Sequence, residues 1–320
     1  MKRVIKKVAK VLLTILVGLM ILPYLIPTNF EDEIPCLPFE NSYFFKTEDE
    51  VILHTQRYVP AQKENGKVLM IHGLGASTYS FANNAPVLQE NGYFVVSVDL
   101  PAFGYSSKDQ GINHSQIENG SRLWQLLDAI DQELDSNQPW TIIGHSMGGS
   151  TSLAMANQQA NRIASLILFS PAIVQRSNNQ SWIFKSPVGE WLKVFLRYFI
   201  ITENNIANIL ERAYVDSVDQ KDVEYYLAPL QTTTTPQALL DFVITSENVS
   251  IDQLEPKDID IHLIWGERDT IVESNQITTI QDNYDIASIN LIKDGGHNVH
   301  EKDPVVNKMI LDILMSSIHE

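Results

Sequence analysis

The chain has 320 residues, a formal net charge of −16 and a single cysteine, Cys36. Five of its 23 basic residues lie in the first ten positions, so the rest of the chain carries 18 basic and 39 acidic residues, a net charge of −21. So acidic a body lacks the basic clusters that displace counterions from nucleic acid, which excludes nucleic acid as a partner. One cysteine also excludes an intrachain disulfide and a cysteine-based metal cluster.

Residues 1–27 are expected to form an N-terminal membrane anchor or a signal segment. Five basic residues precede sixteen uncharged, mostly apolar residues, Val11 to Ile26. This length lies between a signal-peptide core of about 7–15 residues and a bilayer span of about 17–25. Retention is favoured because Lys10 can reach the membrane interface and no small-x-small cleavage site follows. The basic flank then predicts a single-pass membrane protein with an extracytoplasmic body; the alternatives are secretion after cleavage, or a buried or surface helix.

From about residue 42 onward the pattern alternates between strands and helices. Alternating or continuous apolar runs predict strands, and amphipathic spacing predicts helices. Such a succession is typical of a mostly parallel α/β sheet with helices on both faces. The expected strands lie within 42–59 (two strands), 66–73, 92–101, 139–144, 162–172, 259–269 and 286–297, and the expected helices span 115–134, 147–159 and 304–318.

Residues 173–256 interrupt this alternation. They are rich in aromatic residues and helical patterning, and no clear buried strand appears until residue 259. Because the sheet pattern then resumes, we expect a helical cap, or lid, inserted into one α/β core made of residues 40–172 and 257–320. Six aromatic residues could line an acyl pocket beneath this cap or simply pack its helices: Trp182, Phe184, Trp191, Phe195, Tyr198 and Phe199.

The segment TIIGHSMGGS, residues 141–150, carries the strongest chemical signal. Ser146 stands in a G-x-S-x-G pattern between a predicted strand and a predicted helix. In that context the glycines let strand and helix backbones pass closely, while the serine adopts a strained conformation that exposes its hydroxyl. A glycine-rich turn that merely contains a serine is the alternative interpretation. Ser146 is the candidate nucleophile.

A serine nucleophile needs a base, and the base needs an acid that orients it. Asp269 follows one predicted strand and His297 follows the next, and the carboxyl ends of parallel strands are where open α/β sheets build their sites. Glu267 and His300 are the rivals for these two roles. The earlier histidines, His54, His72 and His145, are expected to be structural.

The oxyanion of an acyl-transfer reaction needs backbone donors. The amide of Met147 is one candidate, because it would lie at the amino terminus of the helix that follows Ser146. The amide of Leu74, in the HGLG turn after the strand at 66–73, is the other.

The segments IHGLG, DLPAFGYS, GHSMGG, WGERD and GGHNVHEKDP, in this order between residues 68 and 304, resemble the α/β-hydrolase fold superfamily. Its capped members include monoacylglycerol-lipase-like esterases and carbon–carbon bond hydrolases. The resemblance implies the α/β-hydrolase fold and a triad of Ser146, Asp269 and His297. Ala102 departs from the usual glycine of D-x-P-G-x-G-x-S, in a loop that shapes the site without doing chemistry. These motifs specify neither the anchor nor the cap.

The predicted activity is a serine hydrolase that cleaves small-molecule carboxylic esters, lipid-derived or otherwise apolar, through an acyl-enzyme. It needs no metal, no organic cofactor and no obligate protein partner. A carbon–carbon bond hydrolase of the same fold and a non-catalytic binding protein remain alternatives, and a cofactor-free haloperoxidase or a peptidase is less favoured.

Overall fold

The computed structural model describes residues 2–61, 64–173, 181–246 and 259–316. An eight-stranded sheet of these residues has the order β1-β2-β4-β3-β5-β6-β7-β8. β1 pairs antiparallel with β2 and β2 with β4, and the other neighbours are parallel. The mostly parallel sheet expected from the sequence is therefore confirmed. The strands are β1 (Ser42–Lys46), β2 (Ile52–Tyr58), β3 (Gly66–Ile71), β4 (Tyr93–Val98), β5 (Trp140–His145), β6 (Ile163–Phe169), β7 (Asp260–Gly266) and β8 (Ile286–Ile292).

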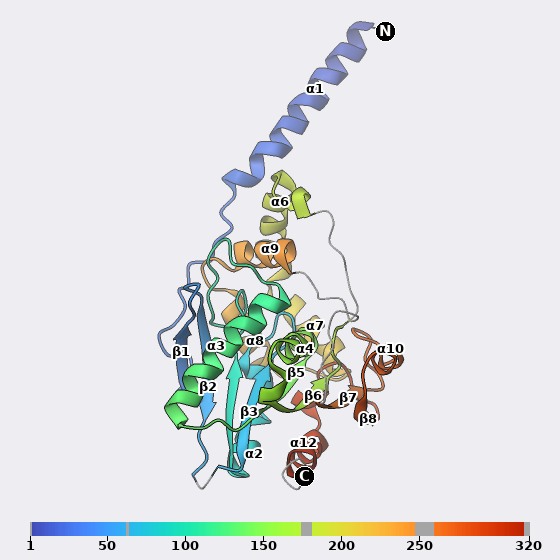
Figure 1. The fold of residues 1–320 in the computed structure, drawn as a ribbon. Helices are drawn as coiled ribbons and strands as arrows, with labels where there is room; N and C mark the ends of the chain where they lie inside the picture. The colour runs from blue at the N-terminus through green and yellow to red at the C-terminus, as the bar shows by residue number, and fades with distance from the viewer. Residues whose placement is uncertain (1, 62–63, 174–180, 247–258, 317–320) are drawn as a thin grey trace.

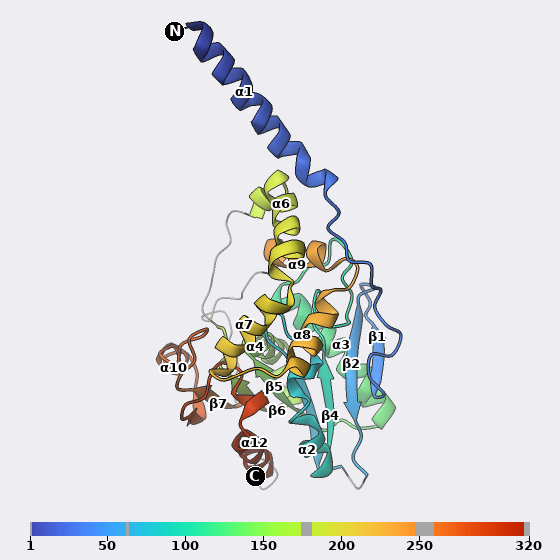
Figure 2. The ribbon, with the colours of Figure 1, turned by 180° about the vertical axis from the view of Figure 1, so that it is seen from behind.

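Helices cover both faces of this sheet, as expected (Figures 1 and 2). On one face lie α3 (Gln116–Leu134), α4 (Met147–Gln159) and α10 (Gln276–Gln281), whose apolar residues join one buried cluster. On the other face lie α2 (Ala85–Glu90) and α12 (Val305–Ser316), which join a second cluster. Short helical turns η2 (Thr78–Phe81), η3 (Ala160–Arg162) and α11 (Val299–Lys302) complete the core.

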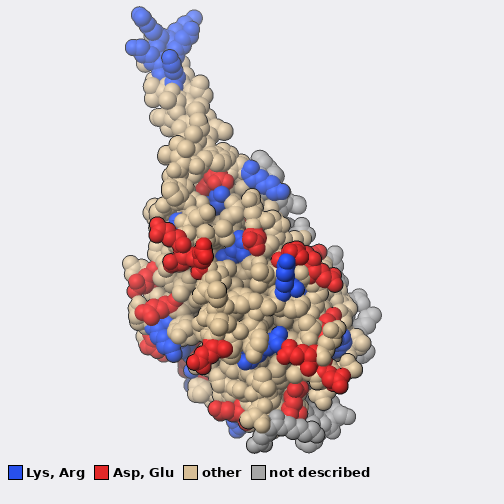
Figure 3. Space-filling model, turned by 90° about the vertical axis from the view of Figure 1, so that its left-hand side faces the viewer, with Lys and Arg blue, Asp and Glu red and all other residues tan. Residues whose placement is uncertain are grey.

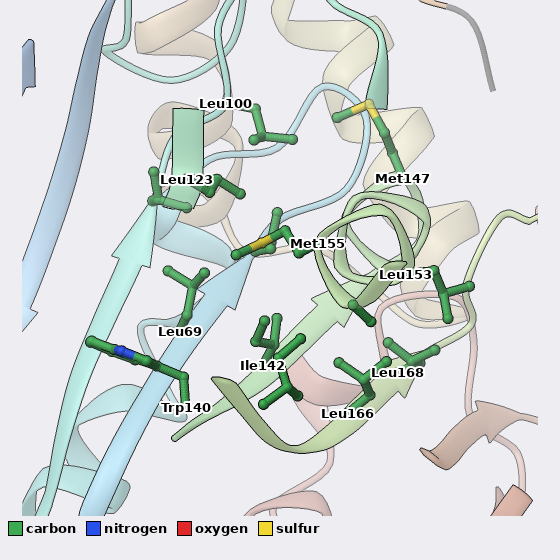
Figure 4. Close-up of a cluster of buried hydrophobic side chains, with 14 of the residues drawn as sticks. Leu69, Leu100, Leu123, Trp140, Ile142, Met147, Leu153, Met155, Leu166 and Leu168 are labelled. Carbon is green, nitrogen blue, oxygen red and sulfur yellow. The ribbon is translucent and has the colours of Figure 1, made fainter. Parts of the chain in front are cut away.

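The central strands are apolar throughout because both of their faces are buried. In β3, Val68 and Met70 belong to the cluster beneath α2 and α12, whereas Leu69 and Ile71 belong to the cluster beneath α3 and α4. Figure 4 shows the cluster beneath α3 and α4, in which Trp140 and Ile142 of β5 and Leu153 and Met155 of α4 are among the buried side chains. This two-sided core fixes the positions of the strand ends, where the candidate site residues lie.

Between β6 and β7 the chain forms helices, and no strand of the sheet lies in the described residues there. We call α5–α9, residues 181–245, the insertion helices. Of the limits expected for the cap, residue 173 is the last one described before this insertion, and residue 256 lies within 247–258, outside the described chain. α7, α8 and η2 share a separate apolar cluster. The insertion helices are α5 (Ser181–Phe184), α6 (Pro187–Phe195), the π-helical segment η4 (Leu196–Ile200), α7 (Glu203–Tyr214), α8 (Gln220–Leu230) and α9 (Thr235–Thr245).

The amino-terminal helix α1 (Lys2–Ile21) projects away from the body and continues into η1 (Leu22–Leu25) (Figure 1). Within Lys2–Leu25, an 18-residue stretch has a mean hydropathy of 2.2, and only 6% of that stretch is buried. Figure 3 shows basic side chains at the free end of α1, an uncharged shaft, and acidic side chains across the visible face of the body. The helix is long and apolar enough to be a membrane anchor or a signal segment.

Candidate active site

Ser146 occupies the turn between β5 and α4. Its backbone has φ 52° and ψ −114°, a conformation that non-glycine residues rarely adopt. Two close backbone approaches hold this turn: a Cβ on Gly148 would collide with the carbonyl oxygen of Ile71, and one on Gly144 would lie 2.6 Å from the carbonyl oxygen of Gly148. The local geometry is therefore the strained strand–turn–helix elbow that the sequence pattern predicts.

The backbone of Ser146 is anchored while its side chain is left available. Its amide donates to the Phe169 carbonyl at 2.9 Å, and its carbonyl accepts from the amides of Gly149 and Ala172, each at 3.0 Å. Among the described residues, the Ser146 hydroxyl has no hydrogen-bond partner. A fixed backbone with an unused hydroxyl suits a nucleophile more than a structural serine.

Asp269 and His297 meet at the carboxyl ends of β7 and β8. His297 Nδ1 lies 2.7 Å from Asp269 Oδ2, and both side chains are buried. The other oxygen, Oδ1, accepts from the amides of Ile271 at 2.8 Å and Val272 at 2.9 Å. An ionised carboxylate accepts only, so Nδ1 of His297 carries the donated proton and Nε2 is left to accept one.

The electrostatics of Asp269 keep it ionised. Burial alone would raise the pKa of its carboxyl, but the hydrogen bond and charge of His297, with the amides of Val272 and Ile271, more than offset this and lower it. An acid that stays ionised can hold the imidazole in one tautomer and stabilise an imidazolium.

His297 lies beside the elbow, where it contacts His145, the residue that precedes Ser146. The rings of His145 and His297 have their centroids 4.6 Å apart, and His145 Nε2 donates to the His297 carbonyl at 3.2 Å. A direct Ser146–His297 hydrogen bond is not formed in the described chain. In an unliganded hydrolase this last bond is often long and closes only with substrate present.

The two amides chosen for the oxyanion belong to segments next to Ser146. Met147 is the first residue of α4, and Leu74 follows Gly73, whose Cβ position would lie 3.1 Å from Ser146 Cβ. Neither amide donates a hydrogen bond to another described residue. Unpaired amides at a helix start and in a tight turn are suited to a developing negative charge.

The rival residues lie differently. Glu267 is exposed, and within the described segments it contacts no histidine side chain. His300 is fully buried against the rings of Phe81 and Phe169, and burial lowers its pKa to about 3. His72 is also enclosed: Nδ1 donates to the Gly73 carbonyl at 2.7 Å and Nε2 accepts from the Leu100 amide at 2.9 Å. These contacts favour Asp269 and His297.

A buried acid that the sequence interpretation did not single out lies four residues beyond His297. Glu301 Oε1 accepts from Tyr226 Oη at 2.5 Å and from Asn298 Nδ2 at 2.8 Å, and Oε2 accepts from Tyr214 Oη at 2.8 Å. Its place within GGHNVHEKDP was visible, but the two tyrosines come from the insertion helices and have no local signature. No group of three or more His, Cys, Asp or Glu side chains in the described residues could hold a metal ion.

The described geometry can be set beside known proteins. The family model for the α/β-hydrolase fold matches residues 67–304. The uncharacterized hydrolase YugF of Bacillus subtilis is 24% identical over 271 residues, covering 84% of this chain and 96% of that protein. A 2-hydroxy-6-oxononadienedioate/2-hydroxy-6-oxononatrienedioate hydrolase of Escherichia coli is 23% identical over 266 residues, covering 77% and 86%.

Solved structures agree on the fold. A bacterial membrane phospholipase A superposes with a TM-score of 0.67 at 17% identity, with all of both chains covered. The meta-cleavage product hydrolase of Pseudomonas fluorescens superposes with a TM-score of 0.67 at 18% identity, covering 86% of this chain and 98% of the other. The mostly parallel sheet, the strained turn at Ser146 and the family match over residues 67–304 together establish that the chain belongs to the α/β-hydrolase family, and it is a hydrolase of that fold.

Proposed function

We propose that this hydrolase cleaves carboxylic esters with Ser146 as nucleophile, His297 as general base and Asp269 as the orienting acid. The observation that carries the proposal is the 2.7 Å contact between His297 Nδ1 and Asp269 Oδ2, at strand ends beside the strained, unbonded Ser146. The amides of Leu74 and Met147 serve as the oxyanion donors. Ser146 lies more than 100 residues before Asp269, and His297 lies 28 residues after it, so three separate chain segments supply this arrangement, which supports a functional origin for it.

The chemistry follows from the proton positions. His297 Nε2 takes the proton of Ser146 as Oγ attacks the ester carbonyl carbon, and the two amides stabilise the oxyanion. The tetrahedral adduct then expels the alcohol, which receives that proton from His297. Water adds to the acyl-enzyme by the same steps and releases the acid. Asp269 remains ionised throughout and stabilises the imidazolium.

A fluorophosphonate probe tests the nucleophile directly. We expect stoichiometric labelling of the full-length protein, with the label on the peptide that contains Ser146. Ser150, in the first turn of α4, is the matched control, because Ser150→Ala removes a neighbouring hydroxyl, which donates to the Ala172 carbonyl, and leaves Ser146 in place. Labelling that persists in Ser146→Ala would refute the assignment, and an unlabelled wild type would favour the binding-protein alternative.

We further propose that α1 is an uncleaved anchor, that residues 173–256 act as a cap, and that the substrates are lipid-derived. The end of α1 contacts the insertion helices: Trp191 Nε1 donates to the Leu19 carbonyl and Tyr198 Oη to the Pro27 carbonyl, each at 2.8 Å. Beside these contacts, Val188, Phe195 and Phe199 are half exposed or more. An apolar surface where a membrane helix leaves the body favours contact with lipid. The side chain of Trp182 lies outside the described residues.

An ester chain-length panel with membrane fractionation tests this extension. We expect the protein to stay in the membrane fraction after alkaline carbonate extraction, with the body accessible from the extracytoplasmic side, and kcat/KM to rise with acyl length. A soluble mature protein that begins after residue 26 would contradict the anchor. A preference for acetyl over longer esters would contradict lipid-derived substrates.

The second candidate is a carbon–carbon bond hydrolase with the same triad. The names of the E. coli and P. fluorescens relatives favour it. The E. coli name denotes a dicarboxylate, and a doubly anionic substrate requires cationic partners that the acidic body supplies sparsely. Hydrolysis of esters without turnover of a vinylogous diketone would select the ester hydrolase.

A further inference from the structure

Glu301 is a buried carboxylate that the proposed chemistry does not use. Its side chain is 6% exposed, yet it belongs to the core segment that carries His297. Buried acids are costly unless every oxygen is hydrogen-bonded. Here Tyr214, Tyr226 and Asn298 together donate three hydrogen bonds of 2.5–2.8 Å to the two oxygens. The carboxyl accepts in all three bonds, so the arrangement fits the ionised form.

The donors come from three separate elements. Tyr214 ends α7 and Tyr226 lies in the middle of α8, and both belong to the apolar cluster of the insertion helices. Asn298 directly follows His297. One carboxylate therefore joins two insertion helices to the backbone next to the candidate base.

The His297 segment is pressed against the insertion helices at the same place. The Asn298 amide donates to the Ala213 carbonyl at 3.1 Å, and a Cβ on Gly296 would collide with that carbonyl. Asn298 Nδ2 also lies 3.3 Å from Tyr226 Oη. Both neighbours of His297 are thus held by α7, and Glu301 fixes one of them.

The structure assigns to Glu301, on the premise of the proposed function, the role of a positioning residue: its ionised carboxylate, bound by Tyr214 and Tyr226, holds Asn298 and so aims His297 at Ser146. Protonation would set an O–H against groups that already donate, so one hydrogen bond must reorganise. Hydrolysis should then depend on the ionisation of Glu301 as well as on His297.

The groups that face Glu301 come from every element packed against it. Tyr214 lies on α7, Tyr226 and Asp222 on α8, Tyr79 on η2, and His300 and Lys302 on α11. Asp222 contacts Lys302 Nζ at 2.7 Å and accepts from Tyr79 Oη at 2.8 Å. His300 Nε2 lies 3.8 Å from Glu301 Oε1, but its burial keeps that imidazole neutral.

Substitutions of these neighbours should raise or lower the pKa of Glu301. Burial raises the pKa of Glu301 to about 7, with Asp222 adding to the rise and the tyrosine hydrogen bonds and Lys302 opposing it. Tyr226→Phe removes a donor to the charged form and should raise that pKa. Asp222→Asn removes a nearby negative charge and should lower it.

The test is the pH profile of kcat on a short p-nitrophenyl ester with the full-length protein. We expect Tyr226→Phe to shift the acid limb upward and Asp222→Asn to shift it downward, each by about half a pH unit or more. The matched controls on the same helix are Tyr225→Phe, whose hydroxyl does not contact Glu301, and Glu224→Gln, which removes an exposed acid, and neither should move the limb. A purely structural role would lower kcat in both test variants without opposite shifts, and that result would overturn the assignment.

Unfolding measurements separate this outcome from failure of the proposed function. A carboxyl with a folded pKa near 7 and an unfolded pKa near 4.3 binds more protons when folded, so stability should fall as pH rises between these values. Glu301→Gln should flatten this slope. Activity that survives in Ser146→Ala refutes the proposed function, on which the positioning role rests. If activity depends on Ser146 but the acid limbs of Tyr226→Phe and Asp222→Asn coincide, only the positioning role is refuted.

Discussion

Two Ser–His–Asp arrangements lie among the described residues, and they differ in what surrounds them. One is the candidate site of Ser146, His297 and Asp269. In the other, Ser42 Oγ lies 2.8 Å from His54 Nε2, and His54 Nδ1 lies 2.7 Å from Asp99 Oδ2. The second arrangement has every hydrogen bond of a catalytic triad, whereas the first lacks the bond between serine and histidine. Contact geometry alone would therefore select the group of Ser42 in place of the proposed site.

The difference lies in the use of each serine and its backbone. Ser42 begins β1, where it bonds His54 and also accepts from the Phe39 amide at 3.0 Å. Its own backbone is regular strand, and His54 and Asp99 are fully buried. Ser146 has the reverse character: its backbone is strained, and among the described residues neither its hydroxyl nor the nearby amides of Met147 and Leu74 have a hydrogen-bond partner.

The two acids differ in the same way. The hydrogen bonds of Asp99 are structural. Besides its contact with His54, its carboxylate accepts from the amides of Thr78 at 2.6 Å and Tyr105 at 2.8 Å, and so connects the end of β4 to the segments that carry these two residues. Asp269 binds amides only of its own turn and gives its second oxygen to His297. A triad is identified by the groups that remain available for a substrate, more than by the groups that are already bonded.

The largest contrast should come from the two serines. Ser146→Ala should lower kcat/KM on p-nitrophenyl esters by at least about a thousandfold, because the nucleophile is lost. Ser42→Ala should keep kcat/KM within about threefold while lowering the free energy of unfolding by about 1–3 kcal/mol, since His54 and the Phe39 amide lose a partner. Steady-state kinetics and urea unfolding of both variants measure this, and equal kinetic losses would erase the distinction.

The two acids should separate by a smaller factor. Asp269→Asn should reduce kcat by about a thousandfold or more while the fold persists, because the amide favours the wrong tautomer of His297. Asp99→Asn should act mainly on the melting temperature, because a fully buried acceptor of three hydrogen bonds is disturbed. Activity of Asp269→Asn within about tenfold of wild type would move the orienting role to another acid.

The smallest effect concerns acid unfolding. Burial acts to raise the pKa of Asp99, but His54, His72 and the Tyr105 amide more than offset it, so the folded pKa is lowered, as it is for Asp269. A lowered folded pKa means that each group stabilises the fold above its unfolded value of about 3.9 and loses that contribution as pH falls through the folded pKa. Each Asp→Asn variant should therefore weaken the pH dependence of unfolding below about pH 4. If neither variant changes the pH dependence of unfolding, the contacts of Asp99 and Asp269 with their histidines do not lower the pKa values of these carboxyls.

Much of the fold could be predicted because its signals are local. Continuous apolar runs located the central strands, and β5, Ser146 and α4 follow from ten consecutive residues. The order of Asp269 and His297 after β7 and β8 placed them at one sheet edge, and the structure brings these two side chains together. The catalytic roles of all three remain predictions.

What the sequence could not reveal depends on distant packing. The contacts of Glu301 with Tyr214 and Tyr226 span 87 and 75 residues, and those of His54 with Ser42 and Asp99 cross three strands. Such contacts arise only once the sheet order is fixed, and no periodicity encodes them. His54 was expected to be structural, but its complete hydrogen-bond relay was not foreseen.

The segment that follows α1 is bound to the body by a buried side chain and by backbone hydrogen bonds. Phe30 is buried, its amide donates to the Thr233 carbonyl at 3.0 Å, and the Asp32 carbonyl accepts from the Thr233 amide at 2.7 Å. If α1 is held in a bilayer, this bound segment keeps the body close to the membrane surface. Such a molecule would reach substrate by lateral diffusion in the membrane, with its body at a fixed distance from the surface. Substrates in a facing membrane or in distant solution would have to diffuse to that surface first.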